Sequence, residues 1–260
     1  MKPHLKGDYL TIRFNSFASN GKAILFAGFK PEIFNNWVLA FEYAAKHDKV
    51  QIQNTQGGII LNENDTERGK RLKKRDYILV WKRASTKYCL SIEGSVKTFV
   101  CGANDESIFR TREIQAMFHA KHIADVNGVL IEHYAQLRRA ALKRLRDRNE
   151  TLPQDEKLTG VQRHLIAINT VFRAIAMNEI REDLSHAQTK EERDAVLKRV
   201  EYVRGQHKDE MGENLNSKGH LGIQGLHFDG LEEMAALNPH LADAIWASVH
   251  VRATHSPNYH

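Results

Sequence analysis

The sequence has few cysteines and no long apolar run. Only Cys89 and Cys101 occur among the 260 residues, which is too few for the disulfide framework of a small secreted protein or for a zinc finger. The longest apolar stretches have roughly six residues, whereas a transmembrane helix needs about 20. The basic N-terminus lacks the apolar segment of a secretory signal. We therefore expect a cytoplasmic protein without a membrane partner.

Glycine-rich nucleotide-binding motifs are also missing. Neither the GxGxxG pattern of dinucleotide-binding folds nor the GxxxxGK[ST] pattern of P-loop enzymes occurs. The sequence thus predicts no bound cofactor, and no metal site is assigned. A hydrophobic fraction of 42% with 27% charged residues is ordinary for a folded globular protein.

The first hundred residues predict strands and one helix. Residues 8–29 predict a β-hairpin: every second side chain is apolar at Leu10, Ile12 and Phe14, residues 19–21 supply the turn, and residues 22–29 return as a mostly apolar strand. Pro31 suits the first position of a helix that ends near His47. The apolar residues of this helix recur at spacings of three and four and predict one buried stripe: Ile33, Phe34, Trp37, Val38 and Phe41.

Further strands are expected beyond this helix. Dense aromatic and β-branched residues favour a strand at residues 77–81, and Glu93-Gly94-Ser95 favours a hairpin turn. In that hairpin the two cysteines are not directly opposite, so reduced, buried thiols are expected. The expected strands are residues 50–53, 59–61, 77–81, 88–92 and 96–101, with a polar loop at 62–75.

The pattern changes after Asn104. Residues 108–148 favour helix throughout, either as one kinked helix or as two helices joined at Asn127-Gly128. Thr189 and Glu192 form a capping box for a later helix, which Val196, Val200 and Val203 continue. An apolar seam suited to helix pairing is predicted from its spacing: Val161, Leu165, Ile168, Phe172 and Ile175.

These patterns predict an α+β fold with three regions. Residues 1–104 form an antiparallel β-sheet with one packed helix, and residues 105–204 form a helical region. Residues 205–260 form a loop and short C-terminal helices that pack back on the rest, since their apolar side chains need burial.

Two basic clusters give the strongest functional signal in a chain of formal net charge +6. In each span a single acidic residue, Asp76 or Asp147, opposes the basic ones. Such clusters attract polyanions, and each phosphate contact releases condensed counterions. The clusters are Arg68, Lys70, Arg71, Lys73, Lys74, Arg75, Lys82, Arg83 and Lys87, and Arg138, Arg139, Lys143, Arg144, Arg146 and Arg148.

Aromatic residues follow the first cluster closely. If residues 77–81 form a strand, Tyr77 and Trp81 share one face of it, and Tyr88 lies on the next strand. Aromatic rings beside cationic side chains suit single-stranded nucleic acid, because every base offers a face for stacking. The opposite interpretation, in which Tyr77, Leu79 and Trp81 face the core and the basic loop is merely solvated, remains open.

We therefore predict a non-enzymatic protein that binds single-stranded RNA or DNA, and a place as a subunit of a larger ribonucleoprotein is a further expectation. One alternative is a metal-independent ribonuclease, for which a histidine beside Arg or Lys supplies acid, base and phosphate stabilisation. The candidates for the acid or base are His227 and His255–His260. His119, His122 and His133 share one face if their helix is continuous, so His119 and His122 could bind one metal ion, but no third ligand is evident. A second alternative is a protein-interaction scaffold built on the helical seam. The binding prediction depends on the two basic clusters forming one continuous cationic surface.

Overall fold

The computed structural model describes residues 23–27, 29–30, 34–59, 74–103 and 107–199. Contacts divide the chain into two compact units, one of Met1–Lys30 and Asn35–Ile131 and the other of Pro31–Phe34 and Glu132–His260. The division falls at residue 131, whereas the sequence pattern predicted a change near residue 104. The first strand of the predicted 8–29 hairpin and the whole segment 205–260 lie outside the described residues.

The mixed α+β class is confirmed, but the predicted antiparallel sheet is wrong. Five strands have the order β4-β1-β5-β6-β7. The first four are mutually parallel, and only β7 runs antiparallel to β6. A separate two-stranded sheet joins β2 (Phe29–Lys30) to β3 (Phe34–Asn35). The strands of the main sheet are β1 (Ala23–Phe26), β4 (Val50–Gln51), β5 (Glu93–Phe99), β6 (His122–Val126) and β7 (Val129–Leu130).

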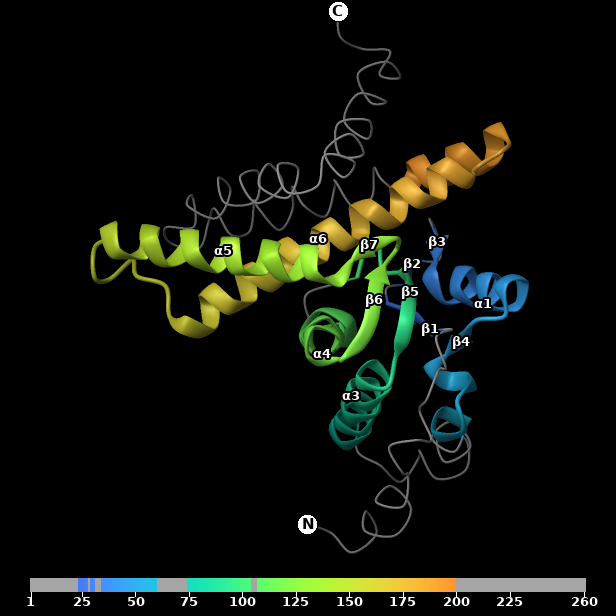
Figure 1. Cartoon of the computed structure of the whole chain (residues 1–260), viewed down its shortest axis with the longest axis horizontal. Coiled ribbons are helices and arrows are strands. Elements are labelled where there is room, and N and C mark those ends of the chain that lie inside the picture. Colours follow the sequence, from blue (N-terminus) through green and yellow to red (C-terminus); the bar gives the residue numbers. More distant parts are fainter. Residues whose placement is uncertain (1–22, 28, 31–33, 60–73, 104–106, 200–260) are drawn as a thin grey trace, which may run out of the picture. The chain divides into compact units, whose positions relative to one another are not determined.

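Helices cover both faces of this sheet, as Figure 1 shows: α1 lies on one face, and α3 and α4 lie on the other. This layering follows from the connections. The chain moves from β1 to β4 towards one edge, and from β5 to β6 towards the other. Because crossovers between parallel strands are right-handed, reversing the direction of travel puts the connecting helix on the opposite face.

Helix α3 (Lys74–Leu90) replaces two predicted strands, at residues 77–81 and 88–92. Ala84, Ser85, Tyr88 and Cys89 are buried, and their spacing of one, three and four residues is that of one helix face. A short apolar run such as residues 77–81 does not distinguish a strand from a helix by itself. The predicted 88–92/96–101 hairpin is therefore wrong, although both cysteines are free and buried as expected.

Helix α1 (Asn36–His47) begins later than predicted. Asn35 caps it by accepting hydrogen bonds from the backbone nitrogens of Trp37 (3.0 Å) and Val38 (3.3 Å). The predicted buried stripe is wrong, because Trp37 and Phe41 are 49% and 52% exposed. Small residues face the sheet instead: Ala40 and Ala44 pack against Ile24 and Phe99. Pro31 and Ile33 lie outside the described residues.

The segment after β4 is helical rather than extended. Ile52–Asn54 form a 3₁₀ turn, and residues 56–59 are helical, so the strand predicted from Ile59 is wrong. Gly58 explains the compactness of this turn, since a Cβ there would lie 1.8 Å from the carbonyl oxygen of Ile52. Residues 60–61 are outside the described part.

The predicted helix over residues 108–148 is interrupted by a β-hairpin. A π-helical turn (Phe109–Glu113) leads into α4 (Ile114–His119), and strands β6 and β7 follow before α5. Asn127 and Gly128 have φ of 52° and 75°, the left-handed values of a two-residue hairpin turn. This dipeptide was correctly identified as left-handed, but it joins two strands and not two helices.

The second unit contains α5 (Ile131–Thr151), α6 (Gly160–His186) and a helix over residues 190–199. Helices α5 and α6 share a core of Ala141, Leu145, Ile166 and Ala167. The capping box of Thr189 and Glu192 is confirmed, with both reciprocal hydrogen bonds at 3.1 Å. In the predicted seam, Ile168, Phe172 and Ile175 are buried, whereas Val161 and Leu165 are exposed. Val200 and Val203 lie outside the described residues.

Candidate nucleic-acid interface

Helix α5 separates its apolar and basic residues onto two faces. The buried side is formed by Tyr134, Leu137, Ala141 and Leu145. Successive residues of an α-helix are rotated by about 100° around its axis. Lys143 and Arg146 therefore lie on nearly the same side of the helix as Arg139, away from the buried face. All three are exposed. We call Arg139, Lys143 and Arg146 the α5 cationic face.

Some basic residues of this helix already have internal partners. Arg139 forms an exposed ion pair with Glu132, seven residues earlier on the same face. Arg138 is partly buried, and its guanidinium lies 3.3 Å from Nδ1 of His164 on α6. Burial lowers the pKa of His164, and the Arg138 charge lowers it further. A neutral His164 can therefore accept a hydrogen bond from Arg138, which holds that arginine between α5 and α6.

The remaining members of the second basic cluster differ in exposure. Arg148 is exposed near the C-terminal end of α5, where a cation interacts favourably with the helix dipole. Arg144 is half-buried and has an interaction partner. Lys143, Arg146 and Arg148 are thus exposed cations of the helix, together with the ion-paired Arg139.

Part of the first basic cluster lies on α3. Arg83 is exposed, and Lys82 and Lys87 are half-buried. Arg83 and Lys87 lie on the side of the helix away from Tyr88 and Cys89, whereas Lys82, seven residues before Cys89, shares the face of Cys89. Lys74 and Arg75 belong to the first turn of the same helix, but their side chains are outside the described part. Arg68, Lys70, Arg71 and Lys73 lie outside the described residues altogether. Because the two clusters belong to different compact units, the predicted continuous cationic surface stays a prediction.

Tyr88 is not a surface aromatic. Its side chain is fully buried, and its hydroxyl donates a hydrogen bond to the carbonyl oxygen of Val50 (2.6 Å) and accepts one from the backbone nitrogen of Ile24 (3.3 Å). Burial raises its pKa well above the usual value. The proposed stacking role of Tyr88 is therefore wrong. Trp81 is half-buried and has an interaction partner, and the Tyr77 side chain lies outside the described part.

An exposed aromatic pair was missed by the sequence analysis. The rings of Trp37 and Phe41 are stacked on α1, with centroids 6.0 Å apart and an interplanar angle of 30°. Their helical spacing predicted that they are buried. Such spacing shows that large apolar residues share one side of a helix, but it does not show which side packs against the rest of the protein. The adjacent small residues Ala40 and Ala44 were the available signal, since small side chains permit close packing of a helix on a sheet.

The histidines do not form the predicted single face. His119 ends α4, His122 begins β6 and His133 lies on α5, so three separate elements carry them. Within the described residues, no three His, Cys, Asp or Glu side chains are arranged to hold a metal ion. His227 and His255–His260 lie outside the described residues.

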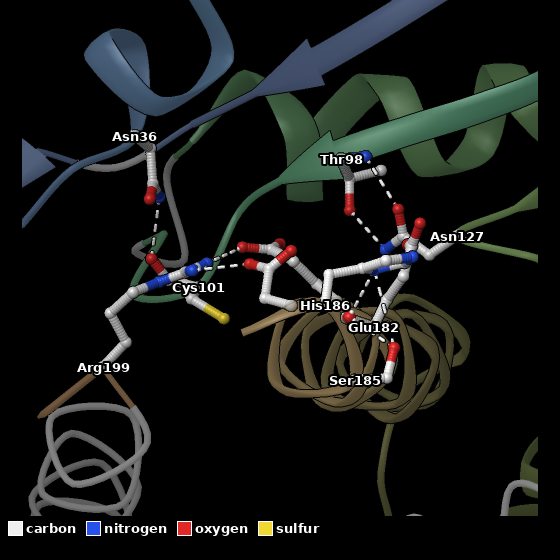
Figure 2. Close-up of polar contacts among 10 residues, drawn as sticks. Asn36, Thr98, Cys101, Asn127, Glu182, Ser185, His186 and Arg199 are labelled. Atoms are coloured by element: carbon white, nitrogen blue, oxygen red, sulfur yellow. Dashed lines mark hydrogen bonds and ion pairs between the residues drawn. The ribbon is translucent and has the colours of Figure 1, made fainter. Parts of the chain in front are cut away.

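A serine and a histidine do lie together at the end of α6, as Figure 2 shows. Nδ1 of His186 is 3.5 Å from the Ser185 hydroxyl and 2.8 Å from the carbonyl oxygen of Glu182. A carbonyl only accepts, so Nδ1 carries the proton. Nδ1 therefore cannot accept a proton from the Ser185 hydroxyl. The His186 side chain instead satisfies the carbonyl of Glu182 in the last turn of α6.

The comparisons with known proteins identify no relative: no family model, curated protein or solved structure matches this chain. In the described part of the chain, no helix combines the length and hydrophobicity needed to span a lipid bilayer.

Proposed function

We propose that this protein binds nucleic acid and that the α5 cationic face contacts the phosphate backbone. The observation that carries the proposal is the exposure of Lys143 and Arg146 on the side of α5 opposite its buried residues. At 1.5 Å per residue, Lys143 lies about 6 Å along the axis from Arg139 and about 4.5 Å from Arg146. This row of cations supports contact with successive phosphates of one strand.

Single-stranded RNA or DNA is the preferred ligand in this proposal. Reading duplex DNA with a helix-turn-helix requires two short helices joined by a turn of three or four residues. Helices α5 and α6 have 21 and 27 residues and are joined by residues 152–159. A flexible single strand, in contrast, can follow a row of cations without entering a groove.

Helix α3 supplies the second set of contacts in the proposal. Arg83, Lys82 and Lys87 would bind further phosphates, with Lys74, Arg75 and the basic residues before them continuing the set. Trp81 and Tyr77 remain the stacking candidates after the loss of Tyr88. Exposed Val161 and Leu165 on α6 are the candidate contacts for another protein subunit.

The decisive experiment measures binding of labelled single-stranded and duplex RNA and DNA across a salt series. For single strands each phosphate contact contributes about 0.7 to the slope of log K against log salt. The double variant K143A/R146A should therefore flatten the slope by about 1.4 and weaken binding. The matched control is K190A/R193A, which removes two exposed cations with the same spacing from residues 190–199.

The control separates a specific face from total charge. If K143A/R146A and K190A/R193A weaken binding equally, or if the slope does not change, the α5 cationic face is not the contact surface. Denaturing gels of the same samples should show intact strands. Strand scission that one His-to-Ala change abolishes while binding persists would support the ribonuclease alternative instead.

A further inference from the structure

Glu113 is a buried acid that nucleic-acid binding does not use. It is the last residue of the π-helical turn, and only 5% of its surface is exposed. One carboxyl oxygen, Oε2, has no hydrogen-bond partner. An unsatisfied buried carboxylate is costly, because water solvates a charge far better than an apolar interior does.

The groups facing Glu113 come from α3, which packs against the turn together with α4. The Ser85 hydroxyl hydrogen-bonds to its carboxyl group and thereby favours the ionised form. Cys89 and Tyr88 also face it, and both have pKa values raised by burial and by the Glu113 charge. These two groups are neutral near pH 7 and offer no compensating positive charge.

Among the other charged groups of α3 whose side chains are described, Lys82 and Lys87 are half-buried and Arg83 is exposed. Arg110, on the same turn, donates a hydrogen bond to the carbonyl oxygen of Ala103 (3.2 Å). Arg112 and the α4 residue His119 are exposed. Desolvation by burial therefore dominates, and the pKa of Glu113 rises from 4.5 to about 7.

We propose that Glu113 is a proton switch: loss of its proton releases the side chain from α3 and opens the π-helical turn Phe109–Glu113. The closed turn binds the proton more tightly than the open turn, in which the carboxyl group is solvated. The closed form is consequently favoured at acidic pH, and its advantage is lost as the pH rises through about 7. A π-helical turn suits such a role, since π-turns are rare insertions that often occur at functional sites.

Hydrogen exchange of the full-length protein at about pH 6 and about pH 8 tests this switch. After correction for the intrinsic pH dependence of exchange, amides of residues 109–119 should open about tenfold more at the higher pH. Amides of α6 serve as the internal reference and should change little. In E113Q, which cannot ionise, the tenfold increase should disappear.

The two other outcomes overturn the proposal. One is an equal change in residues 109–119 and in α6; the other is a tenfold increase that persists in E113Q. If E113Q does not fold, the wild-type comparison with α6 decides alone. S85A adds a readout specific to the carboxyl group, because loss of the hydroxyl should shift the midpoint of opening to higher pH.

Discussion

At the scale of single residues, Tyr88 shows how one side chain can carry two opposite interpretations. An aromatic residue near a basic cluster suits base stacking, and the same residue suits a core if its hydroxyl finds a partner. Here the hydroxyl reaches the backbone of both β1 and β4. It thereby joins α3 to two parallel strands, a contact between residues 64 and 38 positions apart that no local pattern indicates.

Replacing Tyr88 with Phe tests this role directly. The ring would still fill its site, but the carbonyl of Val50 would lose a buried donor, so the free energy of unfolding should fall by about 1–3 kcal/mol. Urea denaturation measures this loss, and nucleic-acid affinity at the same salt concentration should stay unchanged. An unaltered free energy of unfolding would contradict the role of the Tyr88 hydroxyl in joining α3 to the sheet.

Asn127 is a residue whose left-handed backbone could be predicted but whose partners could not. The Asn-Gly pair signals positive φ from sequence alone. Figure 2 shows what it adds in the fold: the Asn127 side chain accepts a hydrogen bond from the backbone nitrogen of Thr98 and donates one to its hydroxyl, both at 2.8 Å. The same figure shows Asn36 donating to the carbonyl of Cys101, a second contact between residues far apart in sequence.

At the scale of elements, the Thr189 capping box could be predicted, whereas the structure of residues 77–81 could not. The Thr189 capping box depends on residues three positions apart, so its chemistry is complete within one turn. The segment 77–81 contains no comparable local hydrogen-bonding motif that would define its secondary structure. It becomes helical because α3 buries a face built from residues further along, including Ala84 and Ser85, and because the parallel strands β4 and β5 need a crossover between them.

Arg199 joins two helical elements of the second unit through a buried ion-pair network. Its guanidinium forms ion pairs with the fully buried Glu179 and, at 2.6 Å, with Asp183. Figure 2 labels Arg199 and draws these ion pairs as dashed lines. Replacing Arg199 with Ala would leave a buried carboxylate without its cation, so the free energy of unfolding should fall by about 3–5 kcal/mol.

Urea denaturation of R199A and R193A provides the measurement. Arg193 is exposed on the same helical segment, so its removal should change stability by no more than about 0.5 kcal/mol. Equal stability of the two variants would show that the network contributes nothing beyond a surface charge.

At the scale of the whole molecule, the two compact units have different chemical character. The first contains the parallel sheet and both thiols, and the second contains the long helices with the α5 cationic face. Thiol chemistry can therefore report on the first unit separately, because Cys89 and Cys101 are both completely buried.

The native protein should react slowly with a soluble disulfide reagent. Burial, and secondarily the Glu113 charge, raise the pKa of Cys89, so the reactive thiolate is scarce as well as inaccessible. We expect labelling of both thiols to be at least about 100-fold slower in buffer than in denaturing urea. Rapid labelling of either cysteine in buffer would contradict the burial of Cys89 in α3 and of Cys101 in the turn after β5.

Features that depend on neighbouring residues could be predicted from the sequence: the mixed α+β composition, the capping box of residues 189–192, the left-handed Asn127-Gly128 pair and the two basic clusters. Other features became visible only in the folded chain: the strand order, the parallel direction of β4, β1, β5 and β6, the side of α1 that is covered and the burial of Tyr88 and Glu113. These features depend on contacts between residues distant in the chain, and the free energy of burying a side chain is a property of the completed core, whereas a turn or a cap gains its hydrogen bonds locally.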